Sequence, residues 1–242
     1  MTLTILPLEG LPEVEAGMDL GELVAQSVAL EDGDVVVLAQ KVVSKAEGRI
    51  VILDEVEPSG RAHELAGSDA DARHVEVILR EAVRIVRTRG PLVIAETRHG
   101  LVCASAGVDA SNAPAPGTLV LLPVDPDASA DGLRRRLREL TGKTVAVIVS
   151  DSFGRPWRQG TTDVAIGCAG IAPLLDLRGS LDASGYELRS TQIAIVDELA
   201  GAAELVMGKA QAVPGAVVRG FAFEGEGSAR ELVMPPERDL FR

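Results

Sequence analysis

VAVIVSDSFGRPWRQGTTDVAIGCAG, residues 145–170, begins with five apolar and mostly β-branched residues. This run predicts a buried strand over 145–149. The strand is expected to end on Ser150-Asp151-Ser152, before a turn rich in Gly, Pro and Arg, and a second apolar run carrying Asp163 follows. Polar groups at the tip of a buried strand are typical of functional sites, so we place a candidate site here.

The turn concentrates groups that suit an anionic ligand. Arg155 and Arg158 can each bind phosphate or carboxylate oxygens through a guanidinium fork, and Trp157 between them is the single Trp of the chain. Asp151 beside the Ser152 hydroxyl is a candidate ligand for Mg²⁺ or Mn²⁺, which prefer oxygen. The alternative is a surface loop in which Arg and Asp pair with each other and Trp157 fills a gap.

Composition narrows the class of protein. The 242 residues suffice for one large domain or two small ones, and 46% hydrophobic with 2% aromatic residues predicts a core of Val, Leu, Ile and Ala. A net charge of −12 argues against nonspecific nucleic-acid binding, which needs a basic face. No apolar run approaches the roughly 18 residues that span a bilayer, and the N-terminus lacks a secretion signal, so we expect a cytoplasmic protein.

Cysteine and histidine offer no metal or disulfide pattern. Cys103 and Cys168 are far apart in apolar surroundings, which indicates two buried thiols. His63, His74 and His99 lack the spacing of a metal pair.

A second buried strand is predicted over 35–39, and it too ends on polar residues. The sequence QKVVSKAEGR, residues 40–49, follows it. Lys41 and Lys45 are four residues apart and are candidates to straddle a polyphosphate. The alternative is that both lysines cap a helix or face solvent.

The remaining pattern alternates strands and helices. The loop 107–114 offers Asp109 and Asn112, either as ligand groups or as simple Asx turns. Periodicity leaves α/β and α+β folds open, and no domain boundary is visible. Further strands are predicted over 2–8, 50–53, 92–96, 100–106, 119–122 and 216–219, and helices over 19–30, 74–87, 131–140 and 190–207, the last capped by Ser190 or Thr191.

Five segments together resemble the coenzyme F420-0:γ-glutamyl ligase family. They are residues 40–49, the loop 107–114, SDSFGRPWRQGTTDVAIGCAG (150–170), LRSTQIAIVDELAGAAELVMGKA (188–210) and VPGAVVRG (213–220). The resemblance implies an α+β fold with mixed sheets and packed helices in intertwined subdomains. It also implies a single ligase domain over 1–242 and a homodimer. Longer relatives continue into a reductase-like domain, so we expect either a stand-alone ligase or the N-terminal half of such an enzyme.

The resemblance implies a GTP-dependent amide ligase. It would add L-glutamate to F420-0, and a second glutamate γ-linked to F420-1, through an acyl phosphate. The implied cofactor is Mg²⁺ or Mn²⁺, with K⁺ as a further candidate. The residues leave open the choice of GTP over ATP, the preferred metal and the number of glutamates added.

Residue roles follow from the same resemblance. Asp109, Asp151 and Ser152 are expected to bind metal, and Gln211 is included although some relatives carry Glu there. Arg155 and Arg158 are our own addition, as catalytic donors to the anionic substrate together with Asp151. The expected nucleotide contacts are Gly10, Leu11, Pro12, Glu13, Gln40, Lys45, Asn112, Met207, Gly208, Lys209 and Gln211.

Two other functions fit the same residues. A metal-dependent phosphohydrolase using Asp109 and Asp151 would cleave a nucleotide or phosphoester without glutamate. A nucleotide-binding protein without turnover would bind GTP and keep its function when Asp151 is changed.

Overall fold

A five-stranded mixed sheet forms the centre of the molecule. The computed structural model describes residues 2–240, and the strand order in this sheet is β1-β12-β2-β8-β9. The β2 and β8 strands run parallel, and the other neighbours are antiparallel. The parallel pair brings the carboxyl ends of both strands to one edge of the sheet, where the predicted polar residues begin.

The chain order of the elements is as follows. The strands are β1 (Thr4–Pro7), β2 (Val35–Ala39), β3 (Ile50–Ile52), β4 (Ala82–Arg89), β5 (Leu92–Thr97), β6 (Val102–Ala104), β7 (Thr118–Val120), β8 (Ala146–Arg155), β9 (Arg158–Ala169), β10 (Leu175–Asp176), β11 (Gln192–Ile193) and β12 (Gly215–Arg219). The helices are α1 (Leu20–Ser27), α2 (Gln40–Ala46), α3 (Gly60–Ala66), α4 (Ala72–Glu81), α5 (Pro126–Thr141) and α6 (Ile195–Met207). Short 3₁₀ turns lie at Leu53–Glu55, Ser105–Gly107, Ala229–Leu232 and Pro236–Arg238.

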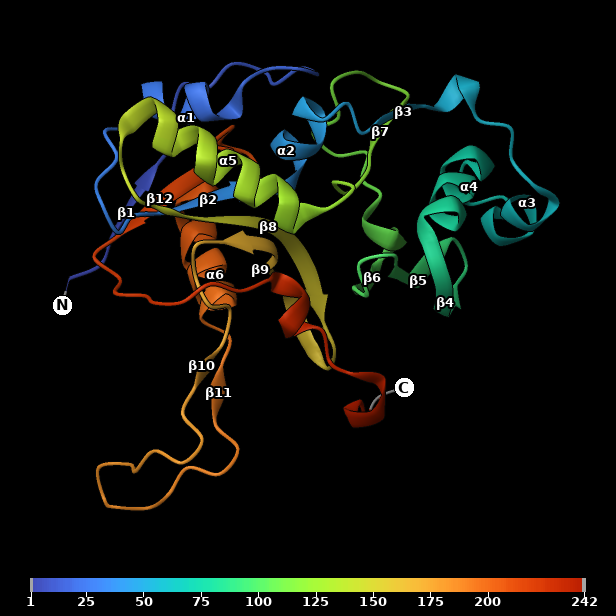
Figure 1. The fold of residues 1–242 in the computed structure, drawn as a ribbon. Coiled ribbons are helices and arrows are strands. Elements are labelled where there is room, and N and C mark those ends of the chain that lie inside the picture. The colour runs from blue at the N-terminus through green and yellow to red at the C-terminus, as the bar shows by residue number, and fades with distance from the viewer. Residues whose placement is uncertain (1, 241–242) are drawn as a thin grey trace.

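Both faces of the central sheet are buried. Val36 and Leu38 of β2 pack with α1 and α5 on one face, whereas Val35 and Val37 pack with α6 on the other. Figure 1 shows α1 and α5 on one side of the sheet and α6 on the opposite side. Alternate side chains of a strand point to opposite faces, so a strand covered on both sides needs a continuous apolar run.

A smaller lobe is formed by residues 50–120. It holds the pair β3-β7, the sheet β4-β5-β6 and helices α3 and α4, which lie together to one side of the central sheet (Figure 1). Separate antiparallel sheets and a mixed central sheet make the fold α+β, as expected. Across residues 2–240, no helix combines the length and apolar character needed to cross a membrane.

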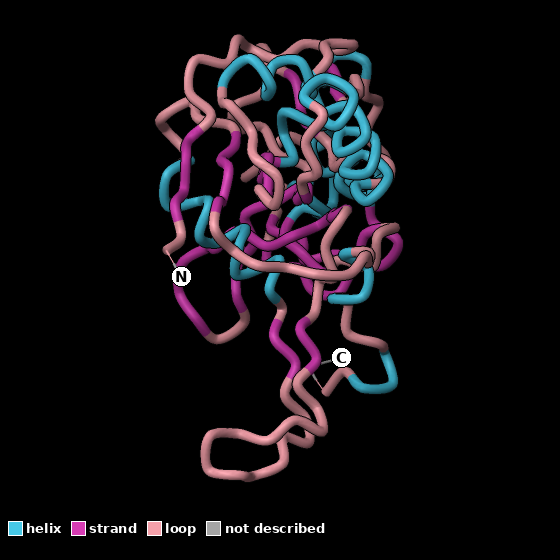
Figure 2. The backbone as a smooth tube through the Cα atoms, turned by 60° about the vertical axis from the view of Figure 1, so that its left-hand side comes forward, coloured by secondary structure: helices cyan, strands magenta, loops and turns pink. Residues whose placement is uncertain are grey.

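A narrow arm leaves the body between β9 and α6. It starts with the short pair β10-β11 and continues as the loop 177–191, which projects away from the body in both views (Figures 1 and 2). Leu181 and Tyr186 on this loop are 68% and 62% exposed.

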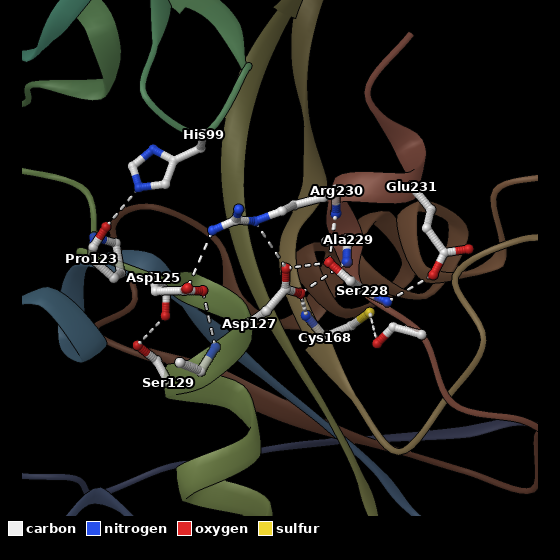
Figure 3. A network of polar contacts seen from close by, with 12 residues as sticks. His99, Pro123, Asp125, Asp127, Ser129, Cys168, Ser228, Ala229, Arg230 and Glu231 are labelled. Atoms are coloured by element: carbon white, nitrogen blue, oxygen red, sulfur yellow. Dashed lines mark hydrogen bonds and ion pairs between the residues drawn. The ribbon is translucent and has the colours of Figure 1, made fainter. Parts of the chain in front are cut away.

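Asp127 ties the C-terminal segment to the body. One carboxylate oxygen accepts hydrogen bonds from the Cys168 and Ala229 amides, and the other accepts from the Ser228 hydroxyl (Figure 3). The start of α5 lies directly on β9, where a Cβ at Gly167 would come within 2.3 Å of the Pro126 carbonyl. Only glycine fits at such a contact.

Several predicted element boundaries are wrong. The helix predicted over 131–140 already starts at Pro126, because Asp125 caps it there. The helix predicted over 74–87 ends at Glu81, and residues 82–89 form β4, because they pair with β5. The strand predicted over 145–149 continues to Arg155, since its hairpin partner β9 supplies hydrogen bonds beyond the polar residues. The helix predicted over 190–207 starts at Ile195 without a side-chain cap, because residues 192–193 pair as β11.

Candidate functional site

The candidate site lies at the carboxyl edge of the parallel strands. Ala39 of β2 is paired in register with Ser150 of β8, so Gln40 and Asp151 follow at neighbouring positions. A pocket of about 370 Å³ opens here, within the range of about 300–1,000 Å³ that is usual for small-molecule sites. Its walls come from residues within the four segments 11–14, 39–45, 150–152 and 204–214, together with Asn112 and Asp163.

Asp151 is the central carboxylate of the pocket. It is half-buried, and no side chain in residues 2–240 hydrogen-bonds to it. Burial raises its pKa to about 7, the Ser152 amide and Lys41 oppose the rise, and the charges of Asp163 and Asp109 add to it. The charged form of such a carboxylate is stabilised when a ligand brings a cation next to it.

Asp163 organises the two serines beside Asp151. It is buried on β9, and it accepts hydrogen bonds from the Ser150 hydroxyl at 2.9 Å and the Ser152 hydroxyl at 2.6 Å. Both serine hydrogens therefore point at Asp163, and the lone pairs of Ser152 remain available to a ligand. We assigned no role to Asp163 from sequence, although a carboxylate within an apolar run was the available signal.

Helix α2 places the polar side chains of Gln40, Lys41 and Lys45 on the pocket. The Ser44 hydroxyl donates to Gln40 Oε1 at 2.9 Å, while the buried Gln40 Nε2 has no partner in residues 2–240. Lys45 is buried and pairs with Glu13 from the turn after β1. A donor without a partner at a pocket wall suits an oxygen-rich ligand.

Asp109 lies behind Lys41. Burial acts to raise the Asp109 pKa, but hydrogen bonds from Lys41 and Ser111 outweigh it and hold that pKa below its usual value. Lys41 Nζ is 2.6 Å from Asp109 Oδ2, and Lys41 lines the pocket whereas Asp109 does not. Asn112, next in the same loop, lines the pocket with a left-handed backbone (φ 53°) that asparagine tolerates.

The turn after α6 forms another wall. Met207, Gly208 and Lys209 line the pocket, as does Glu204 from the last turn of the helix. Gly208 has φ 55°, and a Cβ there would meet the Gln211 side chain at 2.1 Å. Gln211 is outside the pocket lining, and its Oε1 accepts from the Ala210 amide at 3.1 Å.

The two arginines lie at the tip of the β8-β9 hairpin, away from the pocket lining. Arg155 donates to the Gln159 carbonyl at 2.9 Å, and Arg158 is its partner across the strands. Trp157 at the turn is 80% exposed, so it does not fill a gap in the core of this chain. Arg155 is four residues beyond Asp151 on an extended strand, or about 13 Å away.

The side-chain oxygens of the site suit a divalent cation only when a bound ligand supplies further oxygens. Among residues 2–240, no three Asp, Glu, His or Cys side chains are grouped so that they could hold a metal. Asp151 and Ser152 do offer hard oxygens, and neither residue is in a salt bridge within residues 2–240. Mg²⁺ is commonly held by one or two carboxylates plus substrate phosphates. The site therefore suits a cation that arrives with a phosphate.

The pocket gathers most of the residues expected from sequence. Gly10, Gln211, Asp109, Arg155 and Arg158 lie outside its lining. The roles expected for the residues inside and outside the lining all stay predictions. Those inside are Leu11, Pro12, Glu13, Gln40, Lys45, Asn112, Asp151, Ser152, Met207, Gly208 and Lys209. The structure adds Ser150, Asp163 and Glu204 to the lining, and it places Lys41, the other candidate phosphate ligand from sequence, there as well.

Comparisons with known proteins identify the family of the chain. The family model described as F420-0:Gamma-glutamyl ligase matches residues 10–220. Three similar proteins bear the name coenzyme F420:L-glutamate ligase. The one from Methanopyrus kandleri is 52% identical, covering 100% of this chain and 98% of its own length. Those from Methanothermobacter thermautotrophicus and Methanocaldococcus jannaschii are 42% and 45% identical, covering 100% and 93% of this chain and 100% and 90% of theirs.

Proposed function

The chain belongs to the F420-0:gamma-glutamyl ligase family, and from this premise we propose that it joins L-glutamate to coenzyme F420-0 using GTP. The observation that carries the proposal is the pocket itself. It sets the Asp151 carboxylate, Lys41, Lys45 and the unpartnered Gln40 Nε2 around one cavity at the carboxyl edge of two parallel strands. Anionic oxygens and a cation are the ligands such a set would bind.

The proposed reaction has two steps. A carboxylate oxygen of F420-0 attacks the γ-phosphorus of GTP, the bond to the β-phosphate oxygen breaks, and GDP leaves an acyl phosphate behind. The amine of L-glutamate then attacks the acyl carbon, phosphate departs with the former carboxylate oxygen, and one proton leaves the new amide nitrogen. A second round would use the γ-carboxylate of the added glutamate.

The residues of this chain would act by position and charge. Lys45 and Gln40 would donate to phosphate oxygens, and the turns 10–13 and 207–211 with Asn112 would surround the nucleotide. Asp151, Ser152 and Asp109 would hold Mg²⁺ or Mn²⁺, with K⁺ as an optional addition. The divalent cation would supply neutralisation of the charge that develops on the transferred phosphoryl group.

We also propose a homodimer, which the arm supports. Its loop exposes Leu181 and Tyr186, and the tip of the β8-β9 hairpin exposes Trp157. Contact with a second copy would cover these side chains. In that assembly Arg155 and Arg158, distant from the pocket of their own chain, would be available to the substrate of the partner. Light scattering of the purified chain measures the oligomeric state, and a monomer at micromolar concentration would contradict this part of the proposal.

An isotope experiment tests the proposed chemistry. F420-0 labelled with ¹⁸O in its reacting carboxylate is incubated with L-glutamate, Mn²⁺ and either GTP or ATP. Transfer of one ¹⁸O per amide into inorganic phosphate, with GTP preferred, is the expected result. Nucleotide hydrolysis that proceeds without F420-0 and yields unlabelled phosphate would favour a phosphohydrolase, and binding without turnover would favour a nucleotide-binding protein.

A further inference from the structure

Lys41 lies between the pocket and the Asp109 loop. Its side chain is 16% exposed, and its ammonium nitrogen is 2.6 Å from Asp109 Oδ2 and 2.7 Å from the Ser111 hydroxyl. Ser111 in turn donates its amide to Asp109 Oδ1 at 2.6 Å and its hydroxyl to Oδ2 at 3.0 Å. Both oxygens of Asp109 are therefore engaged.

This arrangement conflicts with cation binding at Asp109 as the protein stands. A divalent ion on Asp109 would lie within a few ångströms of the Lys41 ammonium, and like charges at that separation repel strongly in a partly buried site. The field of Lys41 also reaches Asp151, the other carboxylate expected at the cation. Lys41 thus occupies, in charge and position, the place that a metal bound to Asp109 would need.

The pocket gives the Lys41 side chain a second position, away from Asp109. It lines the pocket, and a lysine ammonium on a four-carbon stem reorients easily. The other pocket lysine on this helix, Lys45, already pairs with Glu13 from a different wall. A nucleotide phosphate in the pocket would offer Lys41 a new counter-ion in exchange for Asp109.

We propose that Lys41 is an internal counter-ion of Asp109 that a divalent cation displaces, and that the displaced ammonium then binds a phosphate of the nucleotide. The inference rests on the proposed function for the identity of the phosphate ligand. The exchange couples the binding of the two ligands. A metal that binds alone must break the ion pair between Lys41 and Asp109. When metal and nucleotide bind together, Asp109 pairs with the metal and Lys41 pairs with the phosphate. Lys41 would in this way oppose metal binding to the nucleotide-free protein and favour nucleotide binding to the metal-loaded one.

The test separates these two effects by their opposite signs. Mn²⁺ binding to the nucleotide-free chain is measured by electron paramagnetic resonance, for the wild type and for Lys41→Met, which keeps length and loses charge. Lys41→Met should bind Mn²⁺ about tenfold more tightly than the wild type. At saturating Mn²⁺ it should bind a nonhydrolysable GTP analogue about tenfold more weakly.

Two further variants test whether the shifts in affinity come from a change of structure instead of the loss of the Lys41 charge. Lys143→Met removes an exposed lysine paired with Asp32 and should leave both affinities at wild-type values. Lys41→Gln is the second test variant, in case Lys41→Met fails to fold, and the same two shifts are expected. Unchanged or weaker Mn²⁺ binding in the folded Lys41 variants, or no Mn²⁺ binding in any protein, would overturn the inference.

The result is independent of the ligase assay. If the wild type fails to incorporate glutamate but Lys41→Met tightens Mn²⁺ binding, the proposed function falls and the counter-ion role of Lys41 stands. If glutamate is incorporated but Lys41→Met does not tighten Mn²⁺ binding, the proposed function stands and the counter-ion role of Lys41 falls.

Discussion

The Ser152 hydroxyl donates a 2.6 Å hydrogen bond to Asp163, which lies directly opposite it on the neighbouring strand of the hairpin. Because the hydrogen is committed to Asp163, the oxygen of Ser152 presents its lone pairs to the pocket. Ser150 is held by the same carboxylate. The orientation of Ser152 therefore depends on a residue that need not touch a ligand itself.

Replacement of Asp163 tests this dependence. Asp163→Asn keeps the volume but replaces one acceptor oxygen by an NH₂ donor, which forces one serine hydroxyl to turn. Loss of such an orienting partner typically lowers metal affinity or activity by about 10- to 100-fold, and we expect that loss in Mn²⁺ affinity and in kcat/KM. Asp182→Asn, an exposed aspartate that also accepts from a serine, is the control. Wild-type Mn²⁺ affinity in Asp163→Asn would contradict the assigned role.

Asp151→Asn should abolish turnover without loss of stability. The substitution removes the charge expected to bind the cation, so incorporation of glutamate should fall to background. The free energy of unfolding at pH 8 without metal should not decrease, because burial near Asp109 and Asp163 already disfavours the charge of Asp151. Chemical denaturation and the incorporation assay measure the two effects. Retained activity with unchanged metal dependence would contradict this role.

Arg219→Met should destabilise the central sheet. Arg219 binds both oxygens of Asp34 at 2.8 Å, and Asp34 is only 1% exposed. Removal of the arginine leaves a buried carboxylate unpaired, which should lower the free energy of unfolding by about 3–5 kcal/mol. Urea denaturation measures the change. Arg178→Met, at an exposed pair with Asp176, is the control and should show no measurable change. A loss no larger in Arg219→Met than in the control would contradict the prediction.

His99 should make stability fall in mild acid. Burial lowers its pKa, despite hydrogen bonds to the Pro123 and Val124 carbonyls that favour the charged form. Below about pH 6.5 the unfolded chain therefore takes up a proton that the folded protein resists, and stability falls with falling pH until the lowered pKa is reached. Above that window the stability contribution is fully present.

The measurement compares urea denaturation at pH 7.5 and pH 5.5. His99→Gln should show a smaller loss of stability between the two values than the wild type. His63→Gln, at an exposed position on α3, is the matched substitution. An equal loss in His99→Gln and the wild type would show that His99 does not contribute.

The strands of the central sheet were predictable because burial on both faces leaves a simple pattern. Val35–Ala39 is a strand with the predicted bounds. The opposite case is Ala82, Ile85 and Val86, whose spacing fits a helix although these residues lie in an edge strand. Their conformation is set by pairing with β5, and single-chain periodicity does not contain that pairing.

The candidate site was predictable where strand ends and the family resemblance coincide, as at Asp151 and Gln40. The site was not predictable where the position of a side chain depends on the length of a hairpin. Arg155 follows Asp151 by four residues, and only the continued pairing of β8 with β9 carries it out to the hairpin tip. Lys41 was proposed as a phosphate ligand, and its ion pair with Asp109, 68 residues on, is a tertiary contact.

The central claim is most directly tested by following labelled L-glutamate into purified F420-0 with GTP and Mn²⁺, in the wild type and Asp151→Asn. The proposed ligase function predicts one GDP and one phosphate per amide formed by the wild type. It predicts little nucleotide consumption when either F420-0 or glutamate is omitted, and no amide from Asp151→Asn. GTP consumption that ignores both substrates and yields no amide would contradict it.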